Sequence, residues 1–173
     1  MWNDTDKPLA YLINFRTYGT WLHGDERGSV NRYRNIYGTR YLPHEKEWQI
    51  RNLKKLKIEP VKLDDAQRTC VRVAITECCK VRGWILMAVS VRTNHSHAVL
   101  NSMEKGASLA LNALKANATR ELRRAGLWTE VVSPWPHRGS KRYLWNERSV
   151  TRAIEYVTFG QGDDLPTNFD WLD

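Results

Sequence analysis

The 173-residue sequence lacks long apolar runs and contains little cysteine. No apolar run approaches the roughly 20 residues that a membrane-spanning helix needs, and the first residues lack the basic-then-apolar pattern of a signal peptide. The three cysteines, Cys70, Cys78 and Cys79, have no C-x-x-C spacing and are too few for a disulfide framework. We therefore expect a cytoplasmic protein with reduced thiols and no contact with a membrane.

The chain is also short. A length of 173 residues is enough to bury one core but leaves no room for a separate cofactor-binding domain. The apolar fraction of 42% is too high for a disordered protein. We expect a single domain that spans residues 1–173 and carries no organic cofactor.

Positive charge is in excess and unevenly distributed. The chain has 27 Lys and Arg against 19 Asp and Glu, a net charge of +8. Residues 105–152 hold 10 basic and 3 acidic side chains, whereas residues 153–173 hold 5 acidic side chains and no basic one. Such a basic block attracts polyanions, of which nucleic acid is the commonest in the cytosol; the alternative is a solvated surface that keeps the protein in solution.

Hydrophobic periodicity predicts seven elements in the order strand, helix, strand, strand, helix, strand, helix. The expected strands are 9–17, 84–91, 95–100 and 142–145, and the expected helices are 64–81, 106–125 and 146–159. Residues 18–45 have the composition of a loop, and the basic segment 45–58 is compatible with a helix. The first six elements match the split βαβ, ferredoxin-like pattern, an α+β sandwich with an antiparallel sheet and helices on one face, to which the last helix is added.

Helix 64–81 carries a start signal and an apolar stripe. Asp64, followed three residues later by Gln67, predicts a capping box. Cys70 and Cys78 fall on the apolar stripe of this helix, so we interpret them as core residues rather than as ligands or nucleophiles.

The sharpest local feature is the tetrapeptide Asn94-His95-Ser96-His97. Side chains two residues apart in a strand point to the same side, so the two imidazoles lie next to each other, where one divalent metal ion can bind both. An isolated H-x-H pair is more often a surface or hydrogen-bonded pair. On this otherwise apolar strand, however, two histidines are costly to bury unless they have partners.

Tyr156 is the second notable residue. Val150, Ala153, Ile154 and Val157 form the apolar stripe of helix 146–159. Tyr156 lies roughly 110–120° from the centre of that stripe, at about 100° per residue. It is therefore either an amphipathic residue at the edge of the core or a phenol that faces a metal site on the sheet.

Together these features resemble the Y1 (HUH) transposases of the IS200/IS605 type and, among them, the REP-associated tyrosine transposases. The resemblance spans most of the chain and is clearest in residues 84–100 and 143–156. It implies a metal-dependent endonuclease and strand transferase that acts on single-stranded DNA, often at hairpin ends. It also implies a homodimer in which the helix tyrosine can complete the site of the partner.

The resemblance further implies the roles of individual residues. His95 and His97 would hold Mg²⁺ or Mn²⁺, which polarises the scissile phosphate. Tyr156 would attack the phosphorus, giving a 5′-phosphotyrosine link and a free 3′-hydroxyl. The phenol has a pKa near 10 and is a better leaving group than an alkyl alcohol, so the covalent step is reversible.

Two positions depart from the family pattern. Ser96 stands where the family usually has a bulky apolar residue. The family also tends to place an Asn or Gln ligand one helical turn after the tyrosine, but that position is Gly160 here and the amide follows as Gln161. If Gly160 adopts the left-handed conformation, Gln161 turns towards the metal; His137 is a rival third ligand.

Several basic residues are expected to bind the DNA, because their block lies between the H-x-H strand and the tyrosine helix and would form a track for a single strand. They are Lys115, Arg120, Arg123, Arg124, Arg138, Lys141, Arg142 and Arg148. Trp128, Trp135 and Trp145 lie near these cations, an arrangement that suits stacking on unpaired bases. The alternatives are a degenerate, non-catalytic nucleic-acid-binding module on the same fold, or a rolling-circle initiator or relaxase, which usually carries further domains.

Overall fold

The computed structural model describes residues 7–26, 40 and 42–161. Its elements are β1 (Ala10–Arg16), α1 (Lys46–Lys54), α2 (Asp65–Val81), β2 (Ile85–Val91), β3 (His95–Asn101), α3 (Ala107–Arg124), β4 (Ser140–Leu144) and α4 (Glu147–Phe159). The seven elements predicted from periodicity are thus confirmed, with small shifts at their ends. No helix within these ranges is long and apolar enough to cross a membrane.

The fold divides into two compact units. One unit consists of Met1–Thr17 and Lys62–Asp173, and the other, Tyr18–Val61, is inserted between β1 and α2. In the inserted unit, α1 ends at Lys54, earlier than the predicted 58. Gly24 lies so close to the start of α1 that a Cβ atom would come within 2.5 Å of the Glu45 carbonyl oxygen, and its φ of +92° also favours glycine.

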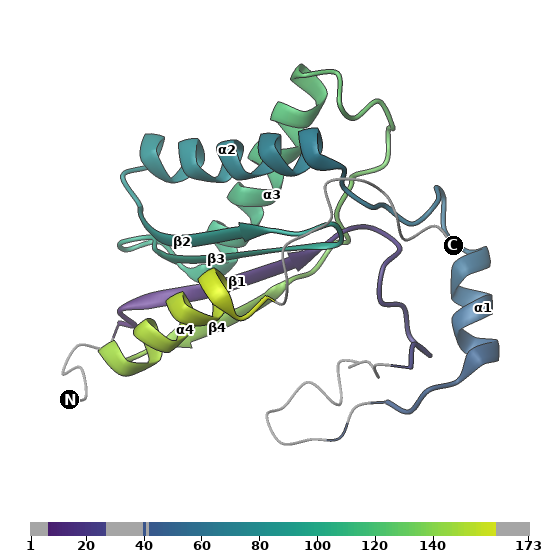
Figure 1. Ribbon diagram of the computed structural model, residues 1–173, viewed down its shortest axis with the longest axis horizontal. Coiled ribbons are helices and arrows are strands. Elements are labelled where there is room, and N and C mark those ends of the chain that lie inside the picture. Colours follow the sequence, from purple (N-terminus) through teal and green to yellow (C-terminus); the bar gives the residue numbers. More distant parts are fainter. Residues whose placement is uncertain (1–6, 27–39, 41, 162–173) are drawn as a thin grey trace. The chain divides into compact units, whose positions relative to one another are not determined.

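The larger unit contains a four-stranded sheet in the order β2-β3-β1-β4, in which all neighbouring strands are antiparallel. In Figure 1, α2 and α3 cover one face of this sheet and α4 lies against the other face. This is the predicted ferredoxin-like α+β arrangement with the added helix.

The alternation of side chains along the strands gives each face its own core. Towards α4, Val99 and Leu144 pack with Ala153 and Val157. Ile13, Phe15 and Leu100 alternate with these residues, point towards α2 and α3 and are fully buried. The apolar stripe of α4 is therefore what attaches this helix, and with it Tyr156, to the sheet.

Side-chain caps fix where two of the helices begin. Asp64 and Gln67 form the predicted capping box of α2, with the Gln67 backbone N–H donating to Asp64 Oδ1 at 2.7 Å. Asn146 caps α4 by accepting a hydrogen bond from the Ser149 backbone N–H at 2.9 Å.

Candidate active site

Strand β3 brings two histidines together on the face of the sheet that α4 covers. His95 and His97 lie two residues apart in this strand, so their side chains point the same way. Their ring centroids are 4.8 Å apart, and the ring planes meet at 83°. The side-by-side arrangement inferred from the H-x-H spacing is present in the structure.

His97 is the more buried of the two, with 4% of its surface exposed. Burial lowers the pKa of His97 from 6.5 to about 4, because the charged imidazolium loses its hydration; the positive charges of His95 and Arg16 lower it further. The ring is therefore neutral at physiological pH, which is the form that binds a metal ion.

Oxygen atoms flank both nitrogens of His95. Its Nδ1 lies 2.7 Å from Asn94 Oδ1, and its Nε2 lies 3.1 Å from Gln161 Oε1. In a neutral ring whose Nδ1–H donates to Asn94, the lone pair of Nε2 faces the lone pairs of the Gln161 oxygen. This separation matches the distance of about 3 Å between adjacent ligands of an octahedral ion with bonds of about 2.1 Å. The donor atoms present therefore fit a divalent cation.

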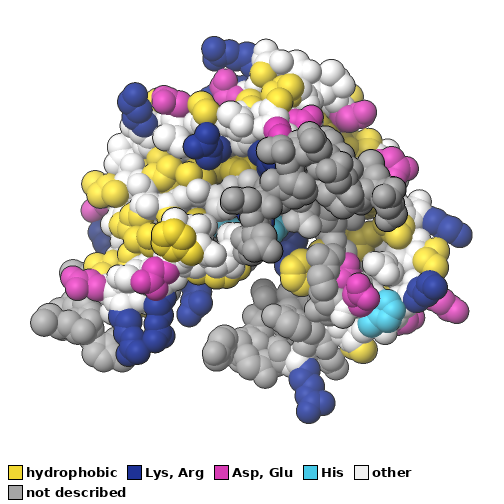
Figure 2. Space-filling view, viewed as in Figure 1, with side chains coloured by type: hydrophobic (Ala, Val, Ile, Leu, Met, Phe, Trp, Pro, Cys, Tyr) yellow, Lys and Arg dark blue, Asp and Glu magenta, His cyan; other side chains and the backbone are white. Residues whose placement is uncertain are grey.

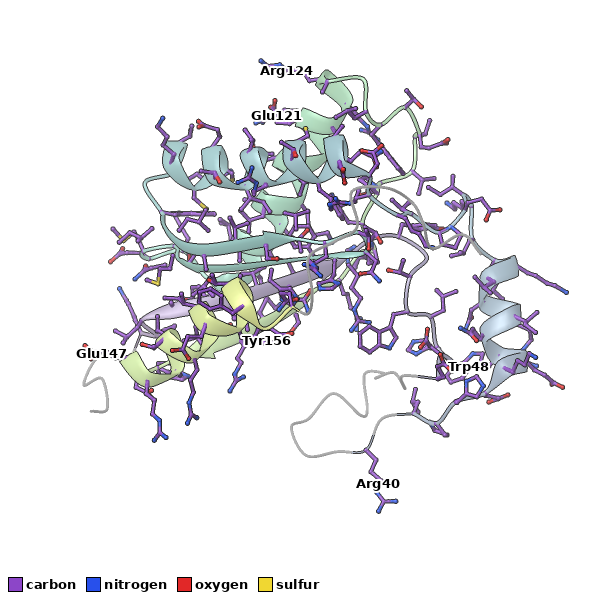
Figure 3. The ribbon with its side chains drawn as sticks, viewed as in Figure 1. Arg40, Trp48, Glu121, Arg124, Glu147 and Tyr156 are labelled. Atoms are coloured by element: carbon purple, nitrogen blue, oxygen red, sulfur yellow. The ribbon has the colours of Figure 1, made fainter. Side chains whose placement is uncertain are left out.

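Tyr156 lies on α4 (Figure 3) and contacts His97. Its ring stands edge-on to that of His97, with 5.5 Å between the centroids and an interplanar angle of 85°. The side chain is 46% exposed. The phenol ring is thus in contact with His97 and about half-exposed.

The turn after α4 differs from the expectation. Gly160 has φ −89° and ψ 13°, so it does not adopt the left-handed conformation that was the condition for Gln161 to turn towards the metal. Its N–H still donates to the Tyr156 carbonyl at 2.9 Å, so the helical path continues far enough to carry Gln161 to the site without a reversal. Gln161 Nε2 also donates to the Tyr156 carbonyl at 3.2 Å, which holds the amide with its oxygen towards His95.

The rival ligand is not at the site. Over the described residues, no group of three or more His, Cys, Asp and Glu side chains is placed to hold a metal ion, so His137 does not join His95 and His97. The backbone carbonyl of His137 instead accepts a hydrogen bond of 3.1 Å from Lys115 Nζ. Lys115 is itself buried and also donates to the Pro136 carbonyl. Its ammonium group therefore holds the loop at residues 136–137 and is not exposed for a contact with a phosphate.

Two further residues of the site lie on β1 and belong to no recognisable sequence motif. Asn14 is paired with His97 and Arg16 with His95 in the antiparallel β1–β3 ladder. Directly paired residues point to the same face, so both side chains lie on the histidine side of the sheet. The sequence could have indicated them only through the alternation along residues 9–17 combined with the correct strand register.

The arginines of α3 lie away from this site. Figure 3 shows Arg124 and Glu121 on the opposite side of the sheet from Tyr156. Both Arg120 and Arg124 form ion pairs with Glu121, at 3.2 and 3.5 Å, and Arg123 donates to two backbone carbonyls. The continuous track expected between the two motifs is therefore not formed, because the sheet separates α3 from α4.

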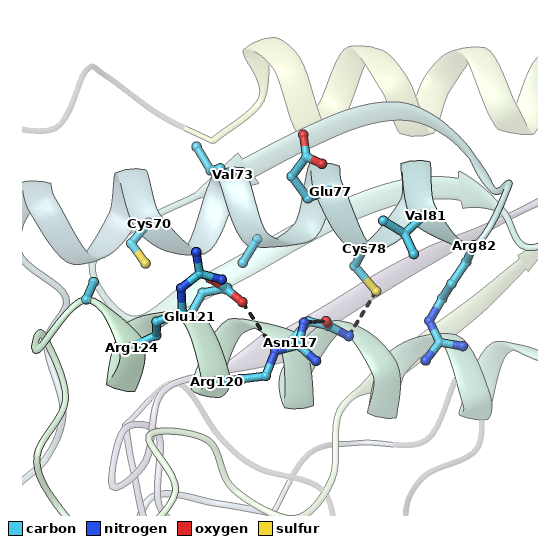
Figure 4. A pocket seen from close by; sticks show the side chains of 12 residues that line it. Cys70, Val73, Glu77, Cys78, Val81, Arg82, Asn117, Arg120, Glu121 and Arg124 are labelled. Atoms are coloured by element: carbon cyan, nitrogen blue, oxygen red, sulfur yellow. Dashed lines mark hydrogen bonds and ion pairs between the residues drawn. The ribbon is translucent and has the colours of Figure 1, made fainter.

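Arg120 and Arg124 line a hollow of about 760 Å³ between α2 and α3 (Figure 4). Asn117 points across it and donates to Cys78 Sγ at 3.2 Å. Burial raises the pKa of the Cys78 thiol, so this cysteine is a core residue as predicted and no thiolate nucleophile. The hollow lies on the face of the sheet opposite α4 and is not part of the histidine site.

The remaining basic residues lie at or near the β4 edge and are exposed: Arg138, Lys141, Arg142 and Arg148. Lys141 donates to Ser108 Oγ of α3 at 2.9 Å, whereas Arg142 is paired with Leu12 and faces the α4 side. In Figure 2, the Lys and Arg side chains of the sheet unit lie in separate groups, some around α2 and α3 and others below α4. Trp135 is a core residue, while Trp145 is exposed and stacks on Tyr143.

No protein-family model and no curated protein matches this sequence. Among solved structures, one of a REP-associated tyrosine transposase bound to a REP hairpin is similar at 12% identity, with a TM-score of 0.49 over 92% of this chain and 72% of that one. A protein of Deinococcus radiodurans R1, described as a candidate transposase, is similar at 12% identity, with a TM-score of 0.50 over 90% of this chain and 93% of that one. The latter likeness establishes a shared fold over nearly the whole of both chains.

Proposed function

We propose that this protein is a transposase, a metal-dependent endonuclease and strand transferase for single-stranded DNA, with Tyr156 as its nucleophile. The observation that carries the proposal is the contact of a half-exposed phenol with the ring of His97, 5.5 Å between centroids, beside His95 and Gln161. A tyrosine, two histidines and an amide oxygen on one face of a sheet are the groups that this chemistry needs.

His95, His97 and Gln161 are the residues that would hold Mg²⁺ or Mn²⁺. Such an ion, when bound, neutralises charge that develops on the scissile phosphate. Asn94 supports the ligand set by fixing the ring of His95 through the 2.7 Å contact with its Nδ1. Gln161 is held by its own hydrogen bond to the Tyr156 carbonyl, so ligand and nucleophile are positioned by one turn of chain.

In the proposed reaction, Tyr156 Oη attacks the phosphorus and the bond from phosphorus to the 3′-oxygen breaks. The phenol proton passes to solvent, and the departing 3′-oxygen takes up a proton to become a free 3′-hydroxyl. The 5′ end remains on Tyr156 as a phosphodiester, so the bond energy is kept for rejoining. In the reverse direction, a 3′-hydroxyl attacks the phosphotyrosine and releases the phenol, which is a better leaving group than an alkyl alcohol.

The substrate we propose is DNA with unpaired nucleotides at a hairpin, as the family resemblance implies. Arg138, Arg142 and Arg148 are exposed and are our candidates for phosphate contacts, together with Arg16 next to the histidines. A homodimer is likewise a proposal from the resemblance, to be tested by light scattering on the purified protein.

The direct test is the formation of a covalent adduct. Protein is incubated with hairpin-bearing single-stranded oligonucleotides and Mn²⁺, denatured, and separated on a gel that resolves protein–DNA conjugates. Wild type should form an adduct that Tyr156→Phe lacks. Tyr143→Phe is the matched control, because this tyrosine is 48% exposed against 46% for Tyr156 but lies on β4. Equal adduct from Y156F and wild type would overturn the assignment of the nucleophile.

A second measurement tests the ion. EDTA or His95→Ala should abolish the adduct while DNA binding, followed by fluorescence anisotropy, is largely kept. Cleavage that persists in EDTA would remove the metal from the proposal. DNA binding without any adduct, over the range of hairpin substrates, would instead favour the non-catalytic nucleic-acid-binding module.

A further inference from the structure

Among the described residues, two polar atoms on the histidine face of the sheet are buried and have no hydrogen-bond partner: His97 Nδ1 and Asn14 Oδ1. Leaving such an atom unpaired destabilises a fold, so each requires an explanation. The two residues are direct partners in the β1–β3 ladder. Paired side chains of an antiparallel sheet share a face and have Cβ atoms about 5 Å apart, so these two orphaned atoms belong to adjacent side chains.

The burial of Nδ1 decides which nitrogen of His97 can face an ion. Mg²⁺ and Mn²⁺ sites that act on a phosphate keep water and substrate oxygens among their ligands, so they need a ligand atom that is open to the site. Nδ1 of His97 has no solvent access. The available ligand atom is therefore Nε2, which in a neutral ring leaves the proton on Nδ1.

The neighbouring histidine already has the matching arrangement. His95 has its Nδ1 2.7 Å from the side-chain oxygen of Asn94, while its Nε2 faces Gln161. Histidines that bind metals commonly donate their other N–H to such an acceptor, which fixes both the tautomer and the orientation of the ring.

We infer that Asn14 is the positioning residue of His97: its Oδ1 accepts the Nδ1–H of His97 and thereby keeps Nε2 unprotonated and directed at the ion. The inference rests on the proposed function for the identity of the site. Such a hydrogen bond would satisfy both orphaned atoms at once. The third buried atom without a partner, Ser96 Oγ, belongs to the alternate residue and points to the other face of the sheet.

The first test is the tautomer of His97 in the metal-free protein, read from long-range ¹H–¹⁵N correlation spectra of histidine-labelled samples near pH 7. Wild type and Asn14→Asp, which keeps an acceptor oxygen, should show the Nδ1–H form. Asn14→Leu has nearly the same shape but no acceptor, and should shift His97 towards the Nε2–H form. Leu also removes an unpaired buried amide, so this variant is expected to fold, which its thermal unfolding will establish.

The second test is the affinity for Mn²⁺ without DNA, from titration with detection of free Mn²⁺ by electron paramagnetic resonance. Asn14→Leu should bind Mn²⁺ about 10- to 100-fold more weakly than wild type, as for other residues that support a ligand, and Asn14→Asp should restore the affinity. Ser90→Ala is the matched control, because Ser90 is the residue paired with His97 in β2, the other strand next to β3. Its affinity and tautomer should not change.

The outcomes separate this inference from the proposed function. An unchanged tautomer and unchanged Mn²⁺ affinity in Asn14→Leu would overturn the role of Asn14. A weaker Mn²⁺ affinity of Asn14→Leu with an unchanged His97 tautomer would also overturn it, because Asn14 would then act as a direct ligand. Mn²⁺ binding that survives His95→Ala and His97→Ala would instead refute the ion site, and absence of a Tyr156 adduct would refute the proposed reaction while leaving the tautomer result intact.

Discussion

The ring of Tyr156 stands edge-on to the ring of His97 within the same chain, at an interplanar angle of 85°. Helix α4 follows β4 directly, and its apolar stripe packs on the histidine face of the sheet. The arrangement therefore brings Tyr156 and the histidine pair, the proposed nucleophile and metal ligands, together in one protomer, although the family resemblance also allows the tyrosine to serve a partner.

This contact predicts the result of a complementation experiment. Tyr156→Phe and His97→Ala are each inactive if the proposal holds, and a mixture should also be inactive, because each chain uses its own tyrosine. The readout is covalent adduct formation after the two variants are mixed and allowed to exchange subunits. Recovery of activity in the mixture would mean that the tyrosine acts across a dimer.

Gly160→Ala should slow adduct formation without unfolding the protein. A Cβ atom at this position would lie 2.9 Å from the Tyr156 carbonyl oxygen and 3.0 Å from its Cδ2, so the end of α4 or the Tyr156 ring must shift. A displacement of a few tenths of an ångström should cost about tenfold in rate. Gly106→Ala is the control, since a Cβ there meets nothing within 4 Å. Equal rates for the two variants would show that the Tyr156 ring tolerates the contact.

Arg16→Ala should reduce adduct formation at least tenfold, because Arg16 is paired with His95 and its charge reaches His97. Arg16→Lys keeps the charge but loses the planar fork that binds a phosphate through two hydrogen bonds, so it should recover only part of the rate. Arg72→Ala, an exposed arginine on α2, serves as the control. An effect of Arg72→Ala as large as that of Arg16→Ala would point to net charge as the cause.

The two groups of arginines should differ in salt dependence. Removing Arg142 and Arg148 together should lower the slope of log affinity against log salt by about 1.4, or about 0.7 for each single-strand phosphate contact. Removing Arg120 and Arg124, which pair with Glu121 behind the sheet, should change the slope little. Both slopes are measured from the binding of a single-stranded oligonucleotide at several salt concentrations. An equal decrease of the slope in the two double variants would indicate that DNA contacts both faces of the sheet.

Acid should destabilise the metal-free protein through His97. Its pKa is about 4 in the folded state against 6.5 ordinarily, so the unfolded chain binds the proton first as the pH falls. The stabilisation is complete above pH 6.5 and is lost as the pH falls towards 4, with a slope of at most about 1.4 kcal/mol per pH unit. Urea unfolding of wild type and His97→Gln in EDTA, at several pH values, isolates this contribution. Parallel pH dependences of the free energy of unfolding for the two proteins would contradict it.

The order and type of the elements followed from local patterns. The alternation of residues 95–100, the amphipathic periodicity of 106–125 and the caps at Asp64 and Asn146 are properties of neighbouring residues, and all appear in the structure. The sequence pattern predicts that β4 begins at 142, but the strand begins at Ser140, because Ser140 pairs with Asn14 of β1 although residues 140–141 have no strand pattern of their own.

The sequence by itself determined the fold class, the pairing of His95 with His97 on one side of a strand, and the position of Tyr156 on the flank of its helix, because periods of 2 and 3.6 residues fix these relations locally. Only the tertiary structure decided that Asn14 and Arg16 stand beside the histidines, since strand register is a relation between distant segments. It also decided that the arginines of α3 lie behind the sheet: charge counted along a chain cannot say which face a helix covers.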